Sequence, residues 1–472
     1  MAKKVPLILG FEGLTLDRDT CDHLLEVNPW GVILFKRNLR DLEQAKALVG
    51  ELKALLGPIL VSIDHEGGLV NRFGPQFPVP PAAFGLHFRP KAELRQAAQM
   101  LAALPAALGF NLNFAPVLDL YHPGSKAIGT RAFHSDPAPV ADWGRLVVEA
   151  HEQVGVASTA KHFPGHGRVT QDSHFEIGRL DSDLAELEAL DLQAFAGLTA
   201  PLVMTSHLYY PALDPVLPAS LSRKIITGLL REKLGYSGLV VSDCVEMEGL
   251  ARNFSPQEMV ELGIRAGLDL WISSFSLKKS RPFQLQLAQA LRDQGQEGDH
   301  PKIEGLIQRY RPHQVSLPPV EEAVALRQRL IQKTGILPPG PWDLVEMENA
   351  VFTGANLGEA QGGFLAQMKQ GHSEIKGTWG FSLSDPKSWT EFFQSRTSQG
   401  RSLLLATKNA RFHPQGAKLA EGAASLPGIL HLDLGDGADM LSPEVPKWNV
   451  FGSDPLTVQA ICRELKQGAN RG

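Results

Sequence analysis

The first 298 residues alternate between short apolar runs and longer segments with helical periodicity, and this alternation restricts the fold more than any other feature. Several of the apolar runs are almost unbroken, as expected for parallel strands that are buried on both faces. The strand candidates are Val5–Gly10, Gly31–Phe35, Ile59–Asp64, Phe110–Leu118, Val154–Lys161, Pro201–Ser206, Gly238–Asp243 and Leu268–Ser273. Eight strands with helices between them predict an α/β fold with a closed (β/α)8 TIM-type barrel, and an open doubly wound sheet is the alternative.

Helical segments between these runs carry start and stop signals. Asp41–Leu56 places its leucines at helical spacing, begins at a capping aspartate and is followed by Gly57. Ser255-Pro256-Gln257-Glu258 is a second start signal, with a capping serine, proline at the first helical position and glutamate at the third. The sequence therefore predicts helices, and not loops alone, between the strands.

Polar side chains stand at the ends of five consecutive strand candidates. In a (β/α)8 barrel the carboxyl ends of the strands meet around one mouth, where active sites assemble. The polar residues at these ends are Asp64, Asp119, Lys161 with His162, His207 and Asp243. Such a ring favours the barrel over the open sheet and predicts a pocket at its mouth.

Beyond a barrel domain of residues 1–298, the chain is expected to form two further parts. Residues 299–340 are predicted to be a helical linker, with helices over Lys302–Tyr310 and Val320–Thr334 before a proline-rich stretch. Residues 341–472 are predicted to be a small α/β C-terminal domain, although residues 345–400 show no clear periodicity. Its strands are expected at Ser402–Ala406, Ile429–Leu432 and Asn449–Phe451, and its helices at Gln415–Ala424 and Leu456–Gln467.

Composition excludes several classes of protein. An apolar content of 43%, a charged content of 21% and a net charge of −5 describe a globular protein without a basic surface for nucleic acid. No apolar stretch approaches the roughly 20 residues that span a bilayer, and no secretory signal pattern is recognised. The cysteines Cys21, Cys244 and Cys462 are far apart, as expected of free thiols in a reducing compartment. We therefore expect a cytoplasmic protein with no nucleic-acid, membrane or obligatory protein partner.

The densest cluster of reactive side chains is Lys161–His174, which contains one lysine, three histidines and one aspartate. Proline and glycine within it prevent a continuous helix, so His162 and His166 do not form a metal site on one helix face. The chain also lacks a Rossmann glycine pattern, and we expect neither metal nor cofactor. A polar loop directly after a buried strand is a usual place for catalytic groups, and the alternative is a solvated loop with incidental histidines.

This cluster resembles a known signature. Lys161-His162-Phe163-Pro164-Gly165-His166-Gly167, followed by Asp172-Ser173-His174, is similar to the motif of glycoside hydrolase family 3, in its bacterial β-N-acetylglucosaminidase branch. The resemblance covers about residues 5–290 and implies removal of terminal β-linked N-acetylglucosamine (N-acetylhexosamine) from peptidoglycan fragments. It also implies that His174, held by Asp172, is the acid/base, and an ordinary histidine pKa near 6.5 suits both steps. Ile177 stands where the family motif usually has proline.

A second motif surrounds Asp243. A carboxylate at the end of a buried strand suits a nucleophile for an anomeric carbon, and the alternative is a structural carboxylate bonded to backbone N–H groups. Residues 242–249, Ser-Asp-Cys-Val-Glu-Met-Glu-Gly, resemble the family's Ser-Asp-Asp-x-x-Met-x-Gly. The resemblance makes Asp243 the nucleophile and implies retention through a covalent glycosyl-aspartate. Cys244 stands where the family has a second aspartate.

A third motif supplies the sugar contacts. Residues 64–72, Asp-His-Glu-Gly-Gly-Leu-Val-Asn-Arg, resemble the family's Asp-x-Glu-Gly-Gly-Arg-Val-x-Arg, with Leu69 in place of the first arginine. A single charged side chain is more often a surface or bridging group, so the joint placement carries the assignment. The predicted substrate-binding residues are Asp64, Arg72, Arg131, Lys161, His162 and His207.

Other functions are compatible with the same residues. Lys161 at a strand end could form a Schiff base, as in barrel aldolases. A phosphorylase would use the same groups with phosphate attacking the intermediate, and a family-3 β-glucosidase would differ in the sugar. A non-catalytic sugar-binding protein is the alternative of another class, suggested by Leu69 and Cys244.

Overall fold

The structure, a computed structural model, describes most of the first 334 residues and parts of the remainder. The described residues are 3–334 except 75, 126, 170–177 and 276, together with 342–348, 363–371, 373, 375–382, 388, 391–392, 402–407, 419, 429–434, 447–450 and 455–469. Asp172 and His174 therefore lie outside the described residues.

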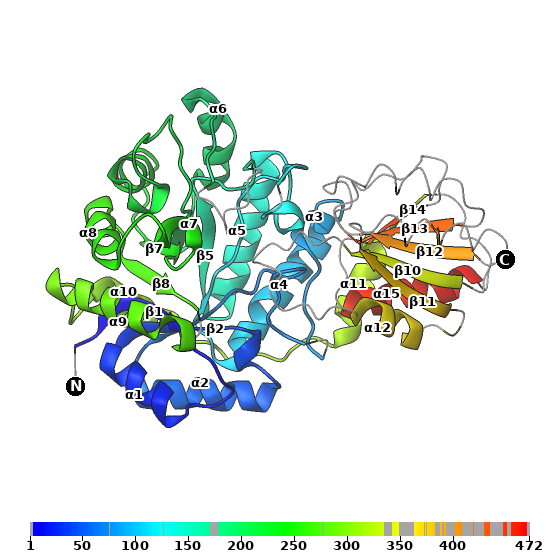
Figure 1. The fold of residues 1–472 in the computed structure, drawn as a ribbon, viewed down its shortest axis with the longest axis horizontal. Coiled ribbons are helices and arrows are strands. Elements are labelled where there is room, and N and C mark those ends of the chain that lie inside the picture. The colour runs from blue at the N-terminus through cyan, green and yellow to red at the C-terminus, as the bar shows by residue number, and fades with distance from the viewer. Residues whose placement is uncertain are drawn as a thin grey trace.

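Eight parallel strands close into a barrel in chain order, which confirms the expected fold class (Figure 1). β8 pairs with β1 through Leu7 and Trp271, and this pairing excludes the open doubly wound sheet for this part of the chain. The strands are β1 (Val5–Gly10), β2 (Pro29–Leu34), β3 (Leu60–Ile63), β4 (Leu112–Asn113), β5 (Ala157–Phe163), β6 (Leu202–Thr205), β7 (Leu239–Cys244) and β8 (Leu270–Ser273).

Helices surround the barrel and begin where the capping signals predict. Asp41 accepts a hydrogen bond from the Gln44 amide at 2.9 Å, and Ser255 with Glu258 forms a complete capping box. The helices are α1 (Arg18–Val27), η1 (Lys36–Asn38), α2 (Leu42–Leu56), α3 (Ala83–Leu86), α4 (Lys91–Leu108), η2 (Gly129–Arg131), α5 (Pro137–Gln153), α6 (Leu184–Ala189), η3 (Asp191–Phe195), η4 (Ala219–Leu221), η5 (Lys224–Lys233), α7 (Glu248–Ala251), α8 (Pro256–Ala266) and α9 (Leu277–Asp293).

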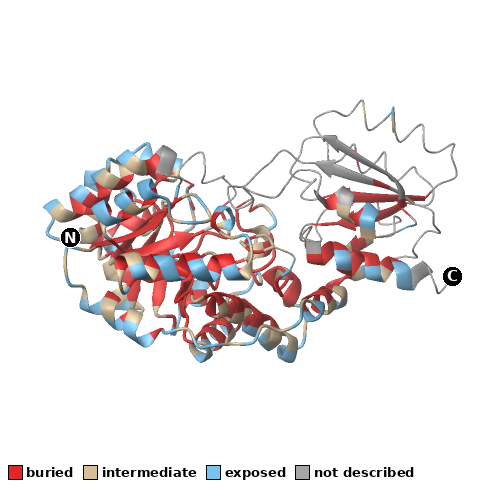
Figure 2. Cartoon of the chain, turned by 90° about the horizontal axis from the view of Figure 1, so that it is seen from below, coloured by how far each residue is buried: buried red, intermediate tan, exposed pale blue. Residues whose placement is uncertain are grey.

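The barrel interior is a packed core and not a pore. Strand residues such as Ile8, Leu60, Leu112 and Val241 are fully buried there, and Figure 2 shows the strands buried while the helices expose their outer faces. Helix α10 (Pro301–Arg309) adds Ile303 and Leu306 to this interior cluster. Backbone bonds on either side of α10, from Gly298 to Lys4 and from His313 to Val154, place this helix across the amino-terminal ends of the strands.

A second, smaller sheet of six strands lies beside the barrel (Figure 1). Its strand order is β11-β10-β12-β13-β14-β9, parallel except for β9, which pairs antiparallel with β14. The elements are α11 (Val320–Leu330), β9 (Gln332–Thr334), β10 (Trp342–Glu348), α12 (Gly363–Gly371), β11 (Ile375–Ser382), β12 (Ser402–Thr407), β13 (Ile429–Asp433), β14 (Lys447–Asn449) and α15 (Pro455–Ala469).

Beyond the barrel, a predicted helix and a predicted strand differ from the observed elements. The helix predicted over Val320–Thr334 ends at Leu330, because Ile331 adopts an extended conformation and the chain continues into β9. The strand predicted at Asn449–Phe451 is instead β14, Lys447–Asn449. The predicted helix Gln415–Ala424 lies outside the described residues except at 419. The domain boundaries at residues 298 and 340 stay predictions. Strand β9, which belongs to the second sheet, lies before residue 340.

Within the described segments, no helix is both long enough and apolar enough to cross a bilayer.

Candidate active site

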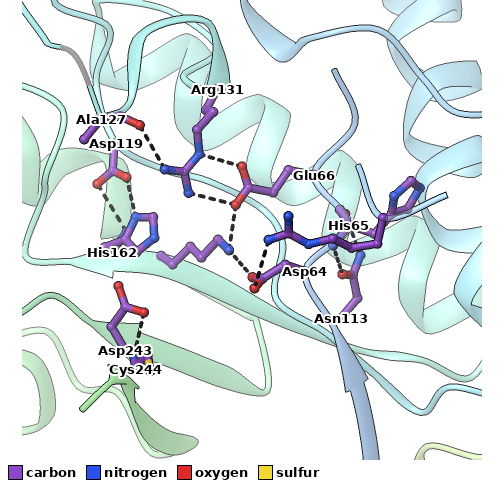
Figure 3. Close-up of polar contacts among 12 residues, drawn as sticks. Asp64, His65, Glu66, Asn113, Asp119, Ala127, Arg131, His162, Asp243 and Cys244 are labelled. Carbon is purple, nitrogen blue, oxygen red and sulfur yellow. Dashed lines mark hydrogen bonds and ion pairs between the residues drawn. The ribbon is translucent and has the colours of Figure 1, made fainter. Parts of the chain in front are cut away.

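The predicted site residues that the structure describes gather at the carboxyl ends of the barrel strands. Asp64 directly follows β3, Lys161 and His162 lie near the end of β5, and Asp243 lies near the end of β7. Arg131 ends η2, in the connection between β4 and α5. Figure 3 shows Asp64, Arg131, His162 and Asp243 facing the same space, as expected for a barrel mouth.

Glu66 joins two of the predicted cations. Arg131 donates from Nε and Nη2 to the two oxygens of Glu66 at 2.8 and 2.9 Å, and Lys161 Nζ lies 2.6 Å from Oε1 (Figure 3). Burial would raise the pKa of Glu66, but the two cations outweigh it and hold the pKa well below its usual range. Glu66 is therefore an ionised acceptor that fixes the positions of Lys161 and Arg131.

Asp64 holds the other side of Lys161. Its Oδ1 accepts a hydrogen bond from Lys161 Nζ at 2.7 Å, and Arg72 Nη2 lies 3.7 Å from Oδ2. The side chains of Asp64 and Arg72 are 18% and 15% exposed, whereas Lys161 is 2% exposed. Asp64 and Arg72 are thus placed where a ligand entering the mouth can reach them.

The protonation state of Lys161 bears on the Schiff-base alternative. Burial lowers the pKa of a lysine, but Asp64 and Glu66 outweigh this effect and raise the pKa of Lys161 above its ordinary value. An amine must be neutral to attack a carbonyl group. The geometry therefore suits a fixed cation that donates hydrogen bonds and disfavours a nucleophilic lysine.

Asp119 orients His162. The fully buried Asp119 carboxylate accepts hydrogen bonds from His162 Nδ1 at 2.6 Å, from the His162 amide at 3.2 Å and from the His166 amide at 2.7 Å. Burial would raise the pKa of Asp119, but the two histidines and these bonds hold it below its usual value. Because an ionised carboxylate only accepts, Nδ1 of His162 carries a proton and donates this hydrogen bond to Asp119.

Asp243 is a half-buried carboxylate beside His162, His207 and Lys161. Its Oδ1 accepts a hydrogen bond from the Cys244 amide at 2.7 Å. Burial would raise the pKa of Asp243, but His162, His207, this amide and Lys161 outweigh it and hold the pKa below its usual value. The carboxylate is therefore ionised at neutral pH, as a nucleophile must be.

His207 supports the end of β7. Its Nε2 donates to the Cys244 carbonyl oxygen at 3.1 Å, so its Nδ1 accepts from the Ser220 hydroxyl at 2.7 Å. Burial lowers the pKa of His207. Both ring nitrogens are thus engaged beside Asp243, and a direct sugar contact from His207 stays a prediction.

Cys244 removes a charge from the surroundings of Asp243. The thiol is buried, and burial with the nearby Glu246 raises its pKa to about 12. Ser274 Oγ donates to Cys244 Sγ at 3.0 Å. A neutral thiol at the position of the family's second aspartate avoids repulsion with the Asp243 carboxylate.

The chain is anchored just before the segment that contains Asp172 and His174. Arg168 donates from Nε and Nη2 to Asp191 Oδ2 at 2.9 and 2.7 Å, and the Tyr210 hydroxyl donates to the Gly165 carbonyl at 2.7 Å. The residues around β5 therefore give this segment a fixed starting point at the barrel mouth.

Sequence reasoning missed the functions of Glu66 and Asp119 as fixed acceptors. Glu66 is visible in the third motif and Asp119 in the ring of strand ends, but neither pattern shows which cation or imidazole the carboxylate meets. Among the described residues, no group of three histidine, cysteine, aspartate or glutamate side chains is arranged to hold a metal ion.

Known proteins are similar to this chain in sequence and in fold. The glycosyl hydrolase family 3 N terminal domain matches residues 13–308. A β-hexosaminidase of Alkalilimnicola ehrlichii is 39% identical over 276 residues, which are 56% of this chain and 79% of that protein. A glycoside hydrolase family 3 β-N-acetylglucosaminidase from a Paenibacillus species superposes with a TM-score of 0.85 at 27% identity, over 98% of this chain and 95% of that one. NagZ from Neisseria gonorrhoeae, solved with N-trifluoroacetyl-D-glucosamine, gives 0.58 at 30% identity, over 70% of this chain and 97% of that one.

Proposed function

The chain belongs to glycosyl hydrolase family 3, and from this premise we propose that it removes terminal β-linked N-acetylglucosamine with retention of configuration. The observation that carries the proposal is the pairing of an ionised, half-buried Asp243 with the polar group formed by Asp64, Glu66, Arg131 and Lys161 in one barrel mouth. Its relatives include proteins named β-hexosaminidase and β-N-acetylglucosaminidase. Peptidoglycan fragments in the cytoplasm are the proposed source of the substrate.

The proposed reaction has two steps through a glycosyl-enzyme. Asp243 attacks the anomeric carbon while His174 gives a proton to the leaving oxygen, and a covalent glycosyl-aspartate forms. His174 then takes a proton from water, which attacks the same carbon and frees Asp243. Asp172 holds the His174 imidazole in this scheme.

The described carboxylates support a histidine acid. Glu66 and Asp119 accept several charge-assisted hydrogen bonds, and the pKa of each is held below its usual value. Neither is suited to carry a proton at neutral pH, which a general acid must do. This supports the proposal that the Asp172–His174 pair carries out the acid step.

The sugar contacts are proposed for Asp64, Arg72, Arg131, Lys161 and His162. Asp64 and Arg72 are partly exposed, and Lys161 is a fixed donor behind them. Charge-assisted bonds to hydroxyl groups are strong and directional, so this set suits a neutral sugar that must be held in one orientation.

Hydrolysis of 4-nitrophenyl β-N-acetylglucosaminide beside the matching β-glucoside tests the activity and the sugar. We expect clear preference for the N-acetylglucosaminide and, by proton NMR, the β-anomer as the first-formed product. Preference for the glucoside would remove the substrate assignment, and a first-formed α-anomer would refute the covalent route. A sugar phosphate formed when phosphate is present would show a phosphorylase, and binding without turnover would show a sugar-binding protein.

Leaving groups of different basicity separate the functions of His174 and Asp243. With 2,4-dinitrophenol the oxygen departs almost unprotonated, so His174→Ala should retain the first step far better than with 4-methylphenol. General acid catalysis is worth roughly 10²–10⁴-fold, and the gap between the two substrates should approach that range. A burst of dinitrophenol should precede a slow phase, and azide should speed that phase because it needs no deprotonation.

Asp243→Ala is the matched control, because it should depress all substrates alike and show no burst. Equal losses of His174→Ala on good and poor leaving groups, with no burst, would assign the acid/base elsewhere.

A further inference from the structure

Arg327 lies far from Asp243 in the sequence, on the inner face of α11, yet it bonds to the chain that leads into the sugar site. It is 2% exposed. Its Nη1 donates to the Val79 carbonyl at 2.6 Å and its Nη2 to the Pro80 carbonyl at 3.2 Å. Its Nε donates to Thr457 Oγ1 at 3.2 Å, in the first turn of α15. One guanidinium thus connects the helices of the smaller sheet to the barrel.

The Pro80 carbonyl is shared with the turn that carries Glu66. The Gly68 amide donates to this carbonyl at 3.0 Å, and the Glu66 amide donates to the Val70 carbonyl at 2.9 Å. Gly67 and Gly68 both have positive φ, of 82° and 51°, which favours glycine. The turn therefore has a fixed shape, and Pro80 is one of the groups that hold it.

The packing against this turn leaves no room for adjustment. A Cβ on Gly67 would lie 3.0 Å from the Pro80 carbonyl oxygen, and a Cβ on Gly68 would lie 2.5 Å from Ala82 Cα. A displacement of residues 79–82 would therefore move the Gly67–Gly68 turn. Movement of this turn would carry Glu66 with it, and Glu66 sets the positions of Lys161 and Arg131.

We propose that Arg327 is a positioning residue for the sugar site. Its bonds to Val79 and Pro80 fix the Gly67–Gly68 turn, which keeps Glu66 in contact with Lys161 and Arg131. Because Arg327 also bonds to Thr457, the position of Glu66 depends on the docking of α15. The proposal rests on the proposed function for the substrate by which it is measured. It predicts an effect on sugar affinity more than on the bond-breaking step, because Asp243 is on β7 and outside this series of contacts.

The full-length variant Arg327→Met removes the guanidinium and keeps an unbranched apolar side chain. We expect KM for 4-nitrophenyl β-N-acetylglucosaminide and the inhibition constant of N-acetylglucosamine to rise together by about tenfold, since charge-assisted bonds are lost. The kcat of the folded fraction should stay within about twofold, because uniform binding is what is lost. Arg327→Lys should recover part of the affinity, because it keeps a donor and the charge.

Arg329→Met is the matched control. Arg329 lies on the same helix, and its Nε is 3.0 Å from Glu93 Oε1 of α4, so it also connects α11 to the barrel. It should leave both constants unchanged if the effect runs through Val79 and Pro80. An equal rise in both variants, or a folded Arg327→Met with wild-type constants, would overturn the proposal.

Two further measurements cover the remaining outcomes. If Arg327→Met does not fold, Thr457→Val removes the hydroxyl of α15 that accepts from Arg327 Nε, and unchanged sugar affinity in this variant would overturn the proposal. If the wild type neither binds N-acetylglucosamine nor hydrolyses the substrate, the proposed function fails, and amide hydrogen exchange still tests the positioning. The amide hydrogens of residues 66–70 should exchange faster in Thr457→Val than in Arg329→Met. Equal exchange rates would contradict the proposed positioning by Arg327.

Discussion

At the scale of single residues, the protein buries two kinds of titratable group side by side. Buried charged groups have partners of opposite charge, and buried histidines are neutral. Glu66 and Lys161 stay charged because each meets groups of opposite sign. Neither ring nitrogen of His65, between Asp64 and Glu66, meets a hydrogen-bond partner among the described residues, and burial lowers the pKa of His65 to about 3. Burial also lowers the pKa of His151 to about 4, although Nδ1 donates to the Val147 carbonyl at 2.7 Å. The native fold therefore requires the imidazole rings of His65 and His151 to be neutral.

This predicts a loss of stability in mild acid. The folded pKa of His65, about 3, lies below its ordinary value, so between pH 6.5 and 3 the unfolded chain binds more protons. Stability must therefore fall as the pH falls through 6.5. For His65 alone the loss between pH 7 and pH 5 is about 2 kcal/mol.

Urea unfolding of His65→Leu at the two pH values checks this prediction. Leucine has a similar volume and no proton to bind, so the difference between pH 7 and pH 5 should shrink by about that amount. His313→Leu, at an exposed position, serves as the control and should leave the difference as in the wild type. An unchanged difference in His65→Leu would mean that His65 is protonated in the folded protein.

At the scale of elements, the sequence predicts the barrel strands well, because short apolar runs with polar ends fit parallel strands that are buried on both faces. β1 has the expected bounds, whereas β4 is reduced to Leu112–Asn113 from the predicted Phe110–Leu118. Pro116 lies in this region and has no amide to donate, so the regular ladder stops early. β11 was not predicted, because Gly377 and Gly380 weaken its strand signal. The partners of Glu66 and Asp119 could not be predicted, since they come from other strands and loops.

Two glycines, one at the mouth of the barrel and one in the helix across its base, test how closely the elements are packed. A Cβ on Gly167 would lie 1.8 Å from the Leu120 carbonyl oxygen, next to Asp119, so Gly167→Ala should cost at least the roughly 1–3 kcal/mol typical of overpacking. Gly305 lies within α10 with nothing within 4 Å, so Gly305→Ala should add about 1 kcal/mol. Urea unfolding measures both, and equal stability of the two variants would contradict the described packing.

At the scale of the whole molecule, α11 connects the barrel to the second sheet. Its Arg329 pairs with Glu93 on the barrel side, and its Gln328 donates to Glu464 of α15 at 3.2 Å. Figure 1 shows α11 and α15 adjacent, between the barrel and the small sheet. Asp64, Lys161 and Asp243 all belong to the barrel. We therefore infer that the second sheet supports the site without supplying its reacting groups.

A chain that ends near residue 340 checks this division. If it folds, it should keep turnover of an activated aryl substrate, because Asp172 and His174 precede residue 340 and stay in the shortened chain. Its KM should rise, because Arg327 loses Thr457 and α11 loses its packing against α15. The same truncation with Asp243→Ala controls for contaminating activity. A soluble, folded truncation with no turnover would show that the second sheet completes the site.

The filled barrel and the helix across its base have a kinetic consequence. Ile303 and Leu306 of α10 continue the apolar core, so the barrel axis is filled by the described residues and the site opens at the mouth. The released sugar must also leave by the route that the next substrate takes, so it should compete with substrate as a simple competitive inhibitor.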